Sequence, residues 1–288
     1  FDEIERIDVG MGGGNCCITV SADERALYFS HYEGSPRNNP DIYVMTRTSR
    51  DDLFGPARPV PDLNTTFEDW VGPGSLSSGG REIYLVTDRP GGSGGLDIWV
   101  ARFDVPGDPQ GGFHDIEPLG DDLFPGVNTT GRESRPHISQ DGERLHFERG
   151  HGPSEHYVAA RDGAFGGPVL LNAQLRQSFD FGWATISADE KTVIWGEFNP
   201  PFRTGGHGSG DIWMATRESV FDASGRPVPF DPDTVVNLGP PINTASHEFL
   251  PTLTADWPAS GSGLYFLRAN INYRATWHPT GSRGAEKE

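Results

Sequence analysis

Ser75-Leu-Ser-Ser-Gly-Gly-Arg-Glu-Ile-Tyr-Leu-Val-Thr-Asp-Arg-Pro-Gly-Gly-Ser-Gly-Gly-Leu-Asp-Ile-Trp-Val100 is the stretch that decides the fold. A serine and a Gly-Gly turn lead into an apolar strand, and a glycine-rich loop then leads to Asp97-Ile-Trp, which begins a second strand. The same order of features returns along the chain. It predicts a protein built from repeated β-structure.

The turn that opens each unit occurs five times, as Ser21-Ala-Asp-Glu, Ser77-Ser-Gly-Gly, Ser139-Gln-Asp-Gly, Ser187-Ala-Asp-Glu and, more loosely, Thr254-Ala-Asp. An alternating apolar strand is expected after each turn, over 26–30, 82–87, 144–148, 192–197 and 263–268. The next strand begins at Asp41, Asp97, Glu155 and Asp211, at intervals of 56, 58 and 56 residues, and at a degenerate fifth copy from Ile271. Five units of this length fill the chain.

Four short strands per unit, with turn residues throughout, predict an all-β fold: a five-bladed β-propeller of four-stranded antiparallel blades. Outer strands are expected within 54–60, 113–119, 165–171 and 235–238, whereas the fifth unit lacks one. Residues 1–8 alternate and precede the first inner strand, so we expect them to complete the last blade and remove an exposed sheet edge. The predicted domain covers residues 1–280, and residues 281–288 form a polar C-terminal tail.

Composition agrees with a folded, turn-dense β-protein, because 38 Gly and 24 Pro accompany 35% hydrophobic residues, including 17 Phe and 7 Trp. The net charge of −18 repels phosphate backbones and anionic lipids, so we expect neither nucleic-acid binding nor a membrane-surface role. No apolar run reaches the roughly 20 residues of a membrane span, so membrane insertion is not expected. We expect a monomer.

The two cysteines, Cys16 and Cys17, are neighbours, which rules out stapling of distant loops and a four-cysteine zinc site. A vicinal disulfide would need a strained ring. We therefore expect two reduced thiols on opposite faces of a strand.

A related linker follows each outer strand, with Asn64, Asn128, Asn172 and Asn243 at its second position. Asparagine suits turns in which the side chain hydrogen-bonds to backbone, so a structural role is expected. Asn64-Thr-Thr and Asn128-Thr-Thr also match the glycosylation acceptor pattern, but both fall on this structural turn.

The Ser-x-Asp-Gly/Glu turn, the loop Asp88-Arg-Pro-Gly-Gly-Ser-Gly-Gly95 and Asp97-Ile-Trp-Val100 resemble the WD40-like PD40 repeats of TolB-like β-propellers. The resemblance covers nearly the whole chain, and the third and fifth units diverge from it. It implies a bacterial protein that is periplasmic or secreted, with a signal peptide outside this sequence, although a cytoplasmic location stays open. Known members of this group range from protein-binding modules to enzymes, so the resemblance does not decide the activity.

In a propeller, the loops that lead into the innermost strands and the loops between the second and third strands open on one face. We expect the functional residues there, at the mouth of the central channel. The ligand-binding candidates on this face are Trp70, Arg132, Asp180, Trp183, His31, Asp88, Arg89, Arg149, His151, Glu197 and Arg268.

Counting back from Pro136 and Pro251 makes Glu133 and Glu248 equivalent, with Asp69 at or near the same position. If carboxylates converge at one channel mouth, their like charges would raise the pKa of at least one of them or recruit a cation. Three hypotheses follow: a structural ring; a glycan, peptide or other small-molecule site in which Asp69, Glu133 and Glu248 hold Ca²⁺; and a glycoside hydrolase or lyase.

In the enzyme hypothesis Glu133, Glu248 and Asp69 are the catalytic carboxylates and His247 is a base. We expect a structural role for the repeated Asp41, Asp97 and Asp211, because a residue that recurs in every blade usually holds the blade together. Trp99 and Trp213 are expected to pack between blades, whereas Trp70 and Trp183 lie nearer the mouth and are suited to stacking on a sugar.

Overall fold

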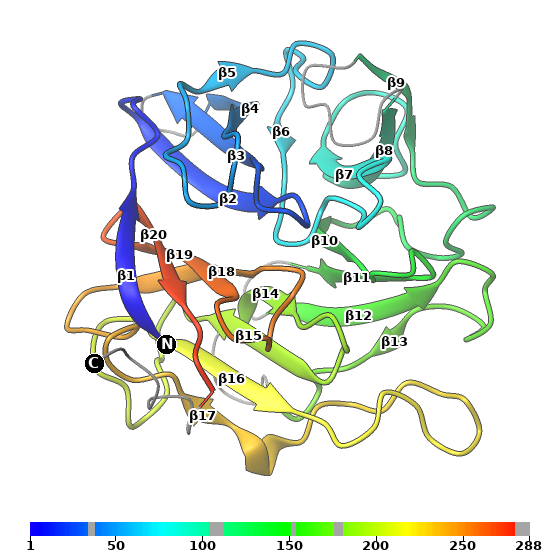
Figure 1. The fold of residues 1–288 in the computed structure, drawn as a ribbon. Helices are drawn as coiled ribbons and strands as arrows, with labels where there is room; N and C mark the ends of the chain where they lie inside the picture. The colour runs from blue at the N-terminus through cyan, green and yellow to red at the C-terminus, as the bar shows by residue number, and fades with distance from the viewer. Residues whose placement is uncertain (34–37, 104–111, 151–153, 176–180, 280–288) are drawn as a thin grey trace.

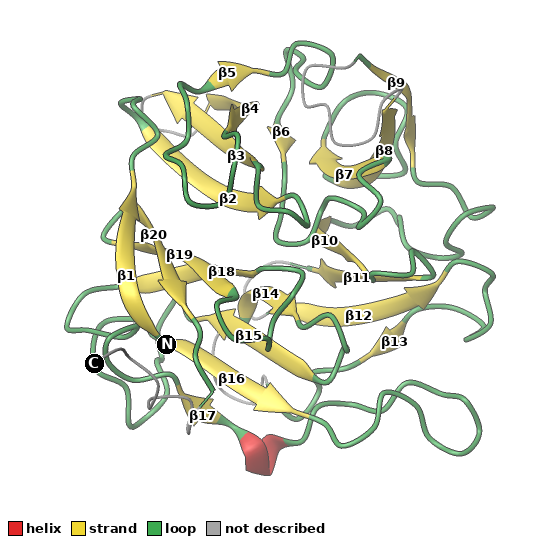
Figure 2. Ribbon diagram, in the orientation of Figure 1, coloured by secondary structure: helices red, strands yellow, loops and turns green. Residues whose placement is uncertain are grey.

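The computed structural model describes residues 1–33, 38–103, 112–150, 154–175 and 181–279. Its strands form five separate sheets of four antiparallel strands, arranged as the blades of a ring (Figure 1). Apart from one short 3₁₀ turn, η1 (Pro232–Thr234), the described chain consists of strands and loops (Figure 2). This confirms the predicted five-bladed β-propeller. The predicted tail, residues 281–288, lies outside the described residues.

Each blade runs outwards from the axis, where residues of all five blades, from the inner strands or the segments that follow them, line one small cavity. Blade 1 contains β2 (Gly14–Val20), β3 (Ala26–Glu33), β4 (Asn38–Thr46) and β5 (Arg58–Pro59). Blade 2 contains β6 (Asp69–Trp70), β7 (Glu82–Thr87), β8 (Asp97–Phe103) and β9 (Phe113–Pro118). Blade 3 contains β10 (Glu133–Ile138), β11 (Arg144–Arg149), β12 (Glu155–Ala160) and β13 (Val169–Leu170). Blade 4 contains β14 (Gly182–Ile186), β15 (Thr192–Gly196), β16 (Ile212–Thr216) and β17 (Val236–Asn237).

Blade 5 joins the two ends of the described chain. It contains β18 (Glu248–Leu253), β19 (Gly263–Arg268), β20 (Ile271–Thr276) and, as its outermost strand, β1 (Asp2–Ile7). The antiparallel register pairs Glu5 with Arg274 and Ile7 with Asn272, and Figure 1 shows β1 in blue beside β20 in red. The predicted closure of the ring by the N-terminal strand is confirmed.

The turns explain why the serine recurs. In four of them the Ser or Thr hydroxyl donates 2.6 Å to the Asp two residues later, as Ser139 does to Asp141. The serine oxygen then accepts the amide that starts the next strand, here Arg144 N at 2.9 Å. The fourth residue of the turn has a positive φ, 77° at Gly142 and 57° at Glu190, which accounts for glycine at this place in two copies.

The linker asparagines are structural, as predicted. Asn128 accepts the Ile98 amide at 2.9 Å and donates to the Ile98 carbonyl at 2.8 Å, so its side chain continues the sheet like a backbone group. Asn64 and Asn243 make the corresponding pair of hydrogen bonds with Ile42 and Ile212, whereas Asn172 accepts the His156 amide and donates to the Ser154 carbonyl. Both side-chain groups of each asparagine are therefore used by the fold.

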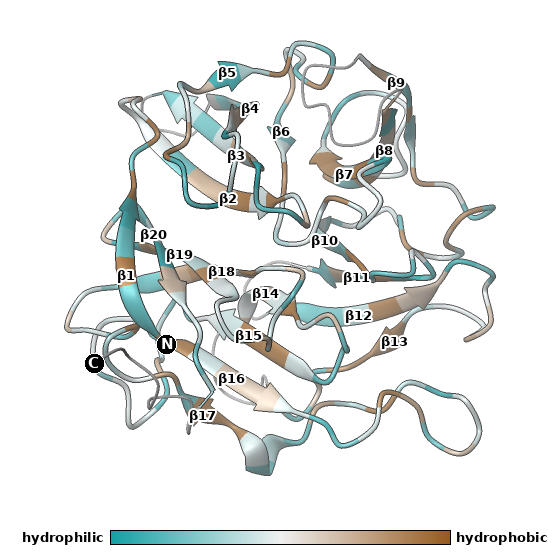
Figure 3. Ribbon diagram, in the orientation of Figure 1, coloured by the Kyte–Doolittle hydropathy of each residue, from teal (hydrophilic) through white to brown (hydrophobic). Residues whose placement is uncertain are grey.

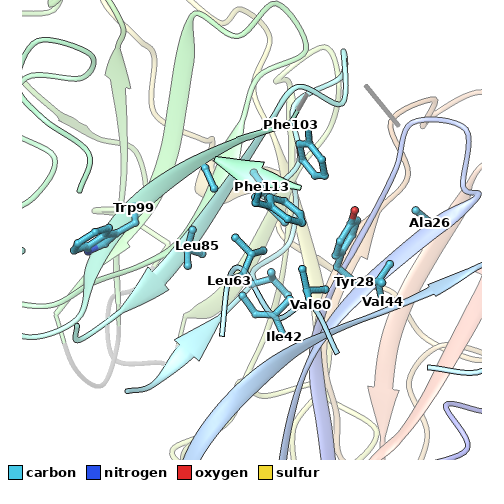
Figure 4. Packing of buried hydrophobic residues seen from close by; sticks show 13 residues of the cluster. Ala26, Tyr28, Ile42, Val44, Val60, Leu63, Leu85, Trp99, Phe103 and Phe113 are labelled. Atoms are coloured by element: carbon cyan, nitrogen blue, oxygen red, sulfur yellow. The ribbon is translucent and has the colours of Figure 1, made fainter. Parts of the chain in front are cut away.

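Apolar side chains fill the space between neighbouring blades. In Figure 4, Tyr28 and Ile42 of blade 1 lie close to Leu85 and Phe103 of blade 2, and Leu63 from the linker lies between them. Trp99 and Trp213, each 6% exposed, belong to such clusters, as predicted. Figure 3 shows the result along the chain: the central strands β7 and β15 carry apolar residues, and the outermost β1 is mainly hydrophilic.

Candidate functional site

The upper face is defined here as the face that holds the starts of the inner strands and the loops after β3, β7, β11, β15 and β19. Asp69, Glu133 and Glu248 are the first residues of β6, β10 and β18, so the predicted equivalence of the three carboxylates is confirmed. All three are 0% exposed. Their burial means that each must be hydrogen-bonded within the protein.

Glu133 is held by a threonine and an arginine. Its Oε2 accepts the Thr129 amide at 3.0 Å, and its Oε1 accepts the Thr129 hydroxyl at 2.6 Å and Arg149 Nε at 3.0 Å. Arg149 also donates to the carbonyls of Gly126 and Val127 in the linker that precedes β10. The carboxylate thus fixes the linker from one blade to the start of the next.

The same arrangement returns in two other blades. Glu248 accepts the amide and hydroxyl of Thr244 and Arg268 Nε at 2.9 Å. Asp69 accepts the amide and hydroxyl of Thr65, each at 2.7 Å, and Arg89 Nη2 at 2.6 Å. We call this repeated unit the carboxylate clamp: an acid at the start of an inner strand, a linker threonine, and an arginine at the end of the second strand (Arg149, Arg268) or two residues after it (Arg89).

The clamps correct the expectation that these carboxylates converge on the channel mouth. Each carboxylate is bound by a threonine of the linker that precedes its strand and by an arginine of its own blade, since burial leaves the acid dependent on those donors. Within the described residues, the one group whose ligating atoms lie within 4.8 Å of one another is Asp2, Glu3 and His278, at the chain ends. The structure therefore does not bring Asp69, Glu133 and Glu248 together as a Ca²⁺ site or as a catalytic pair.

Other side chains occupy the top of the channel. The inner strands β2, β10, β14 and β18 carry a bulge, and the bulged residues Cys17, Arg135, Trp183 and Leu250 have φ values of 63°, 53°, 54° and 56°. Cys17, Trp183 and Leu250 belong to an apolar cluster with Cys16, Phe249 and Leu267, against which Tyr32, Trp70 and Phe198 also pack. The sequence does not reveal this cluster, because a bulge shifts the alternation of inward and outward side chains.

Trp183 is held in place by Arg135, which is itself fixed by Glu148. The Arg135 guanidinium lies 4.2 Å from the centre of its ring, a cation–π contact, and Arg135 Nη1 donates to Glu148 Oε2 at 2.5 Å. Glu148 also accepts the Ala184 amide at 2.9 Å, which ties blade 3 to the inner strand of blade 4. The indole is thereby fixed in place while remaining partly exposed.

Trp70 and Arg132 lie near this group. Trp70 donates from its indole nitrogen to Glu68 at 3.1 Å, and its ring lies 6.3 Å from that of Tyr32. Arg132 is half-buried, and burial, with a further contribution from the positive charge of Arg135, lowers its pKa, while Glu68 opposes the shift. Across the described parts of the chain, no hydrogen bond or ion pair occupies the Arg132 guanidinium.

Most of the remaining predicted site residues make hydrogen bonds within the protein. His31 hydrogen-bonds to Asn15 at 2.8 Å, and Asp88 accepts the Glu68 amide at 2.9 Å. His247 bonds through Nε2 to the carbonyl of Glu197 at 2.8 Å, and its ring centre lies 4.7 Å from that of Phe249. His151 and Asp180 lie outside the described residues.

The repeated aspartates hold loops. Asp97 Oδ2 accepts the amides of Ser93 and Gly94 at 2.8 and 3.0 Å, and Asp211 Oδ2 accepts the His207 amide at 2.6 Å. The predicted structural role is confirmed for these two residues. Asp41 lies opposite His31 in the register of β3 and β4.

Blade 4 departs from the clamp. Glu197 follows β15, in the position that Arg149 has in blade 3, and its Oε1 accepts the Arg203 amide at 3.1 Å. It is 1% exposed, and burial raises its pKa to about 7 despite the nearby Arg203. Among the described acids, Glu197 is thus held partly protonated at neutral pH.

The channel itself is nearly filled. The cavity at its upper end, between Tyr32, Trp183 and Leu250, measures about 20 Å³, and that at its lower end, beside His137, about 50 Å³. A larger hollow, about 860 Å³, lies at the opposite face, where β1 meets the loop after β4. A ligand at the predicted location would therefore lie on the upper face and not inside the channel.

Fold and site together define the class of protein: a five-bladed β-propeller whose upper face carries the partly exposed Trp70 and Trp183 and the half-buried Arg132. Neither a family model nor a curated protein matches the sequence. In the described residues, no helix has the length and apolar content needed to cross a membrane.

Solved structures with similar folds come from different functional groups. An α-L-arabinofuranosidase from Podospora anserina matches 93% of this chain and 92% of its own, at 11% identity and a TM-score of 0.55. A levansucrase from B. megaterium matches 92% of this chain and 82% of its own, at 11% identity and a TM-score of 0.53. TolB from Acinetobacter baumannii matches 96% of this chain at 13% identity and a TM-score of 0.45, and this chain spans 54% of its length. At such identities the likeness shows the fold alone.

Proposed function

We propose that this propeller is a binding module whose upper face holds an anionic glycan beside Arg132, Trp70 and Trp183. The observation that carries the proposal is Arg132: a half-buried guanidinium that makes no hydrogen bond or ion pair with the described residues, and that interacts electrostatically with Arg135, which covers Trp183, and with Glu68, which holds Trp70. A desolvated cation of this kind is stabilised when a ligand supplies the missing anion.

The chemistry of the neighbours favours a sugar carboxylate. Indole rings stack on the apolar face of a pyranose, and a guanidinium binds a carboxylate through two parallel hydrogen bonds. Trp183 is already fixed by Arg135, so little ordering would be needed for a ligand to stack on it. Glu68, which holds Trp70, would disfavour a ligand that is anionic along its whole length.

The test is calorimetric titration with a uronic-acid oligosaccharide, its neutral counterpart and an acidic peptide. We expect the acidic sugar to bind, and Arg132→Met to weaken this binding by roughly 10-fold or more, as for a lost charged hydrogen-bond pair. Arg102→Met, which removes a partly exposed arginine paired with Glu117 in blade 2, is the matched control and should bind normally. Binding of all three ligands with equal affinity, or an unchanged affinity of Arg132→Met, would contradict the proposal.

A second candidate, a glycan-active hydrolase or lyase, is favoured by one observation. Glu197 has its pKa raised to about 7, which suits a general acid, and it lies on the upper face. Glu197→Gln should abolish turnover of a glycan substrate while preserving binding if the protein is an enzyme. Unchanged turnover in Glu197→Gln, or in Glu133→Gln and Glu248→Gln variants that still fold, would remove these acids from any reaction.

We also propose that the protein is exported and acts as a monomer. The resemblance to PD40 propellers supports the first point, and the closure of the ring by β1, which leaves no unfinished blade to pair with a second copy, supports the second. Fractionation of cells and the mass in solution would test the two points separately.

A further inference from the structure

We propose that Cys16 and Cys17 form a redox-active vicinal dithiol, which small disulfides oxidise to an intramolecular disulfide. This goes beyond ligand binding at the upper face and does not depend on it. The site would take low-molecular-weight disulfides as its oxidants and dithiols as its reductants.

The geometry corrects the expectation of two thiols on opposite faces of a strand. Cys17 is the bulged residue of β2, with φ at 63°, so the usual alternation of side chains does not apply. The two sulfur atoms lie 2.9 Å apart, with the Cys17 thiol donating to Cys16 Sγ. The positive φ therefore brings neighbouring thiols into direct contact.

The surroundings favour thiol chemistry over metal binding. Both cysteines line the enclosed cavity of about 20 Å³ together with Tyr32, Trp183 and Leu250. In the described chain, no histidine or carboxylate joins the two thiols in a group of three potential metal ligands. A site with two sulfur donors and apolar walls lacks the donor set of a structural zinc centre.

The two thiols differ in exposure, which sets the order of the reaction. Cys16 is 4% exposed, whereas Cys17 is half-buried, which makes Cys17 the more accessible of the two thiols. The Cys17 thiolate attacks one sulfur of the disulfide R–S–S–R, forms a mixed disulfide and releases one R–SH. Cys16 Sγ then attacks the Cys17 sulfur, the bond to the second R–S group breaks, and the two thiol protons leave on the two R–SH products.

The oxidised form is expected to be easily reduced. The Cα atoms of neighbouring residues are about 3.8 Å apart, below the usual separation of about 4.4 to 6.8 Å across a disulfide. A strained disulfide has a more oxidising potential than a structural one. The pair would therefore cycle between two states and would not act as a permanent staple.

The first experiment uses the aromatic disulfide 5,5′-dithiobis(2-nitrobenzoate) on the full chain. The folded protein should release two equivalents of thionitrobenzoate and end without an adduct, lighter by two hydrogen atoms and still monomeric by mass. Cys16→Ser should release one equivalent and keep the adduct on Cys17. An adduct that persists on the unmodified protein, or an intermolecular disulfide, would overturn the proposal.

A second experiment separates the folded geometry from mere adjacency in the sequence. The release of the second equivalent should be at least about 10-fold faster in the folded protein than in the urea-unfolded chain, because the fold holds the two sulfurs in contact. Equal rates in the two states would show that the fold does not preorganise the pair. Circular dichroism of Cys16→Ser and Cys17→Ser shows whether each variant is folded before its reactivity is interpreted.

Discussion

Arg149 Nε lies 3.0 Å from Glu133 Oε1, across the first pair of β10 and β11, and the same two positions of blade 5 hold Arg268 and Glu248 at 2.9 Å. In both blades the arginine also binds two carbonyls of the preceding linker. In each of these two blades, one ion pair thus ties the inner strand to the linker that precedes it.

Replacing Glu133 with glutamine should destabilise the protein by roughly 3 kcal/mol, because Arg149 then loses its partner in a buried setting. Arg149 is 24% exposed, so water solvates part of the unpaired guanidinium, and the loss of stability lies at the lower end of the range for buried ion pairs. Urea unfolding followed by circular dichroism measures the change. Glu143→Gln, an exposed acid of the same blade, is the control and should be nearly neutral.

The double variant Glu133→Gln/Arg149→Met tests the pairing directly. Its loss of stability should be smaller than the sum of the two single losses, since each single change removes the same interaction. Additive losses would mean that the two side chains contribute independently and that no clamp exists.

Deleting residues 1–8 should open the ring and lower the midpoint of thermal unfolding strongly. The deletion removes β1, exposes the edge of β20 and uncovers the blade-5 core against which Ile4 packs. Deletion of residues 281–288 is the matched control and should leave the midpoint within a few degrees. Comparable losses from the two deletions would contradict the role of β1 in closure.

Stability should fall as the pH drops below about 6.5. Three histidines of blade 3 lie in a row: His146 and His156 are buried and in contact at 3.3 Å, and the half-buried His137 lies edge-on to His146. Burial lowers the pKa of His137 to about 3, and burial is also the main cause that lowers the pKa of His146 and His156. Between these values and 6.5 the unfolded chain binds protons that the folded protein does not, so each histidine costs up to about 1.4 kcal/mol per pH unit.

Urea titrations between pH 4 and pH 8 measure this slope. His156→Phe should make it shallower, because it removes one buried group whose Nδ1 has no hydrogen-bond partner in the described structure. Burial opposes ionisation of Glu190, but its hydrogen bonds with His146 and Arg144 and the positive charge of Arg144 outweigh this and lower its pKa, so Glu190 adds to the loss below pH 4.5. A stability that rises on acidification from pH 6.5 would refute the assignment of the histidines as buried and neutral.

Glu197 should act in the opposite direction. Its pKa is raised by burial to about 7 in the folded protein, so the unfolded chain releases the proton first, and stability falls as the pH rises from 4.5 to about 7. This decline should be absent in Glu197→Gln. The stability of the variant, compared with that of the unmodified protein at the same pH, should therefore be higher at pH 8 than at pH 4. The difference between the two pH profiles isolates Glu197 from the histidines.

Gly94→Ala should destabilise the loop that Asp97 holds. A methyl group at Gly94 would lie 2.6 Å from Thr130 C and 2.7 Å from Thr129 O, both backbone atoms of the next linker. Gly79→Ala, which meets no atom within 4 Å, is the matched control. Thermal unfolding should place Gly94→Ala well below the control, and equal midpoints would show that the loop moves aside at no cost.

Much of the fold could be predicted from the sequence because its local signals agree with one another. The serine turns, the alternating strands and the aspartates before the third strands recur at one spacing, and each has a local cause, such as the Ser139 to Asp141 hydrogen bond. The alternation of residues 1–8 also sufficed to place β1 in the last blade, since only that blade lacked an outer strand.

The site was harder to predict, because its layout depends on the bulges. Equivalence of Glu133 and Glu248 follows from their distance to a proline, but the direction of their side chains also depends on Arg149 and Arg268, which the pairing of the second strand brings beside them. The positive φ of Cys17 could not be predicted from the residue type, since cysteine has no preference for that region of backbone conformation. Long-range contacts and local strain were therefore beyond a reading of periodicity.

The pairing of β1 with β20 has a consequence for how the gene could be rearranged. Asp2 lies opposite Thr276, so the first strand begins where the last one ends, and the turn before β2 contains Gly10 and Gly12, whose surroundings are empty. A circular permutant that starts at Gly12 and appends residues 1–9 through a short linker after Thr276 would encode all five blades as uninterrupted hairpins. The native order of the strands is then one of several equivalent ways to cut the same ring.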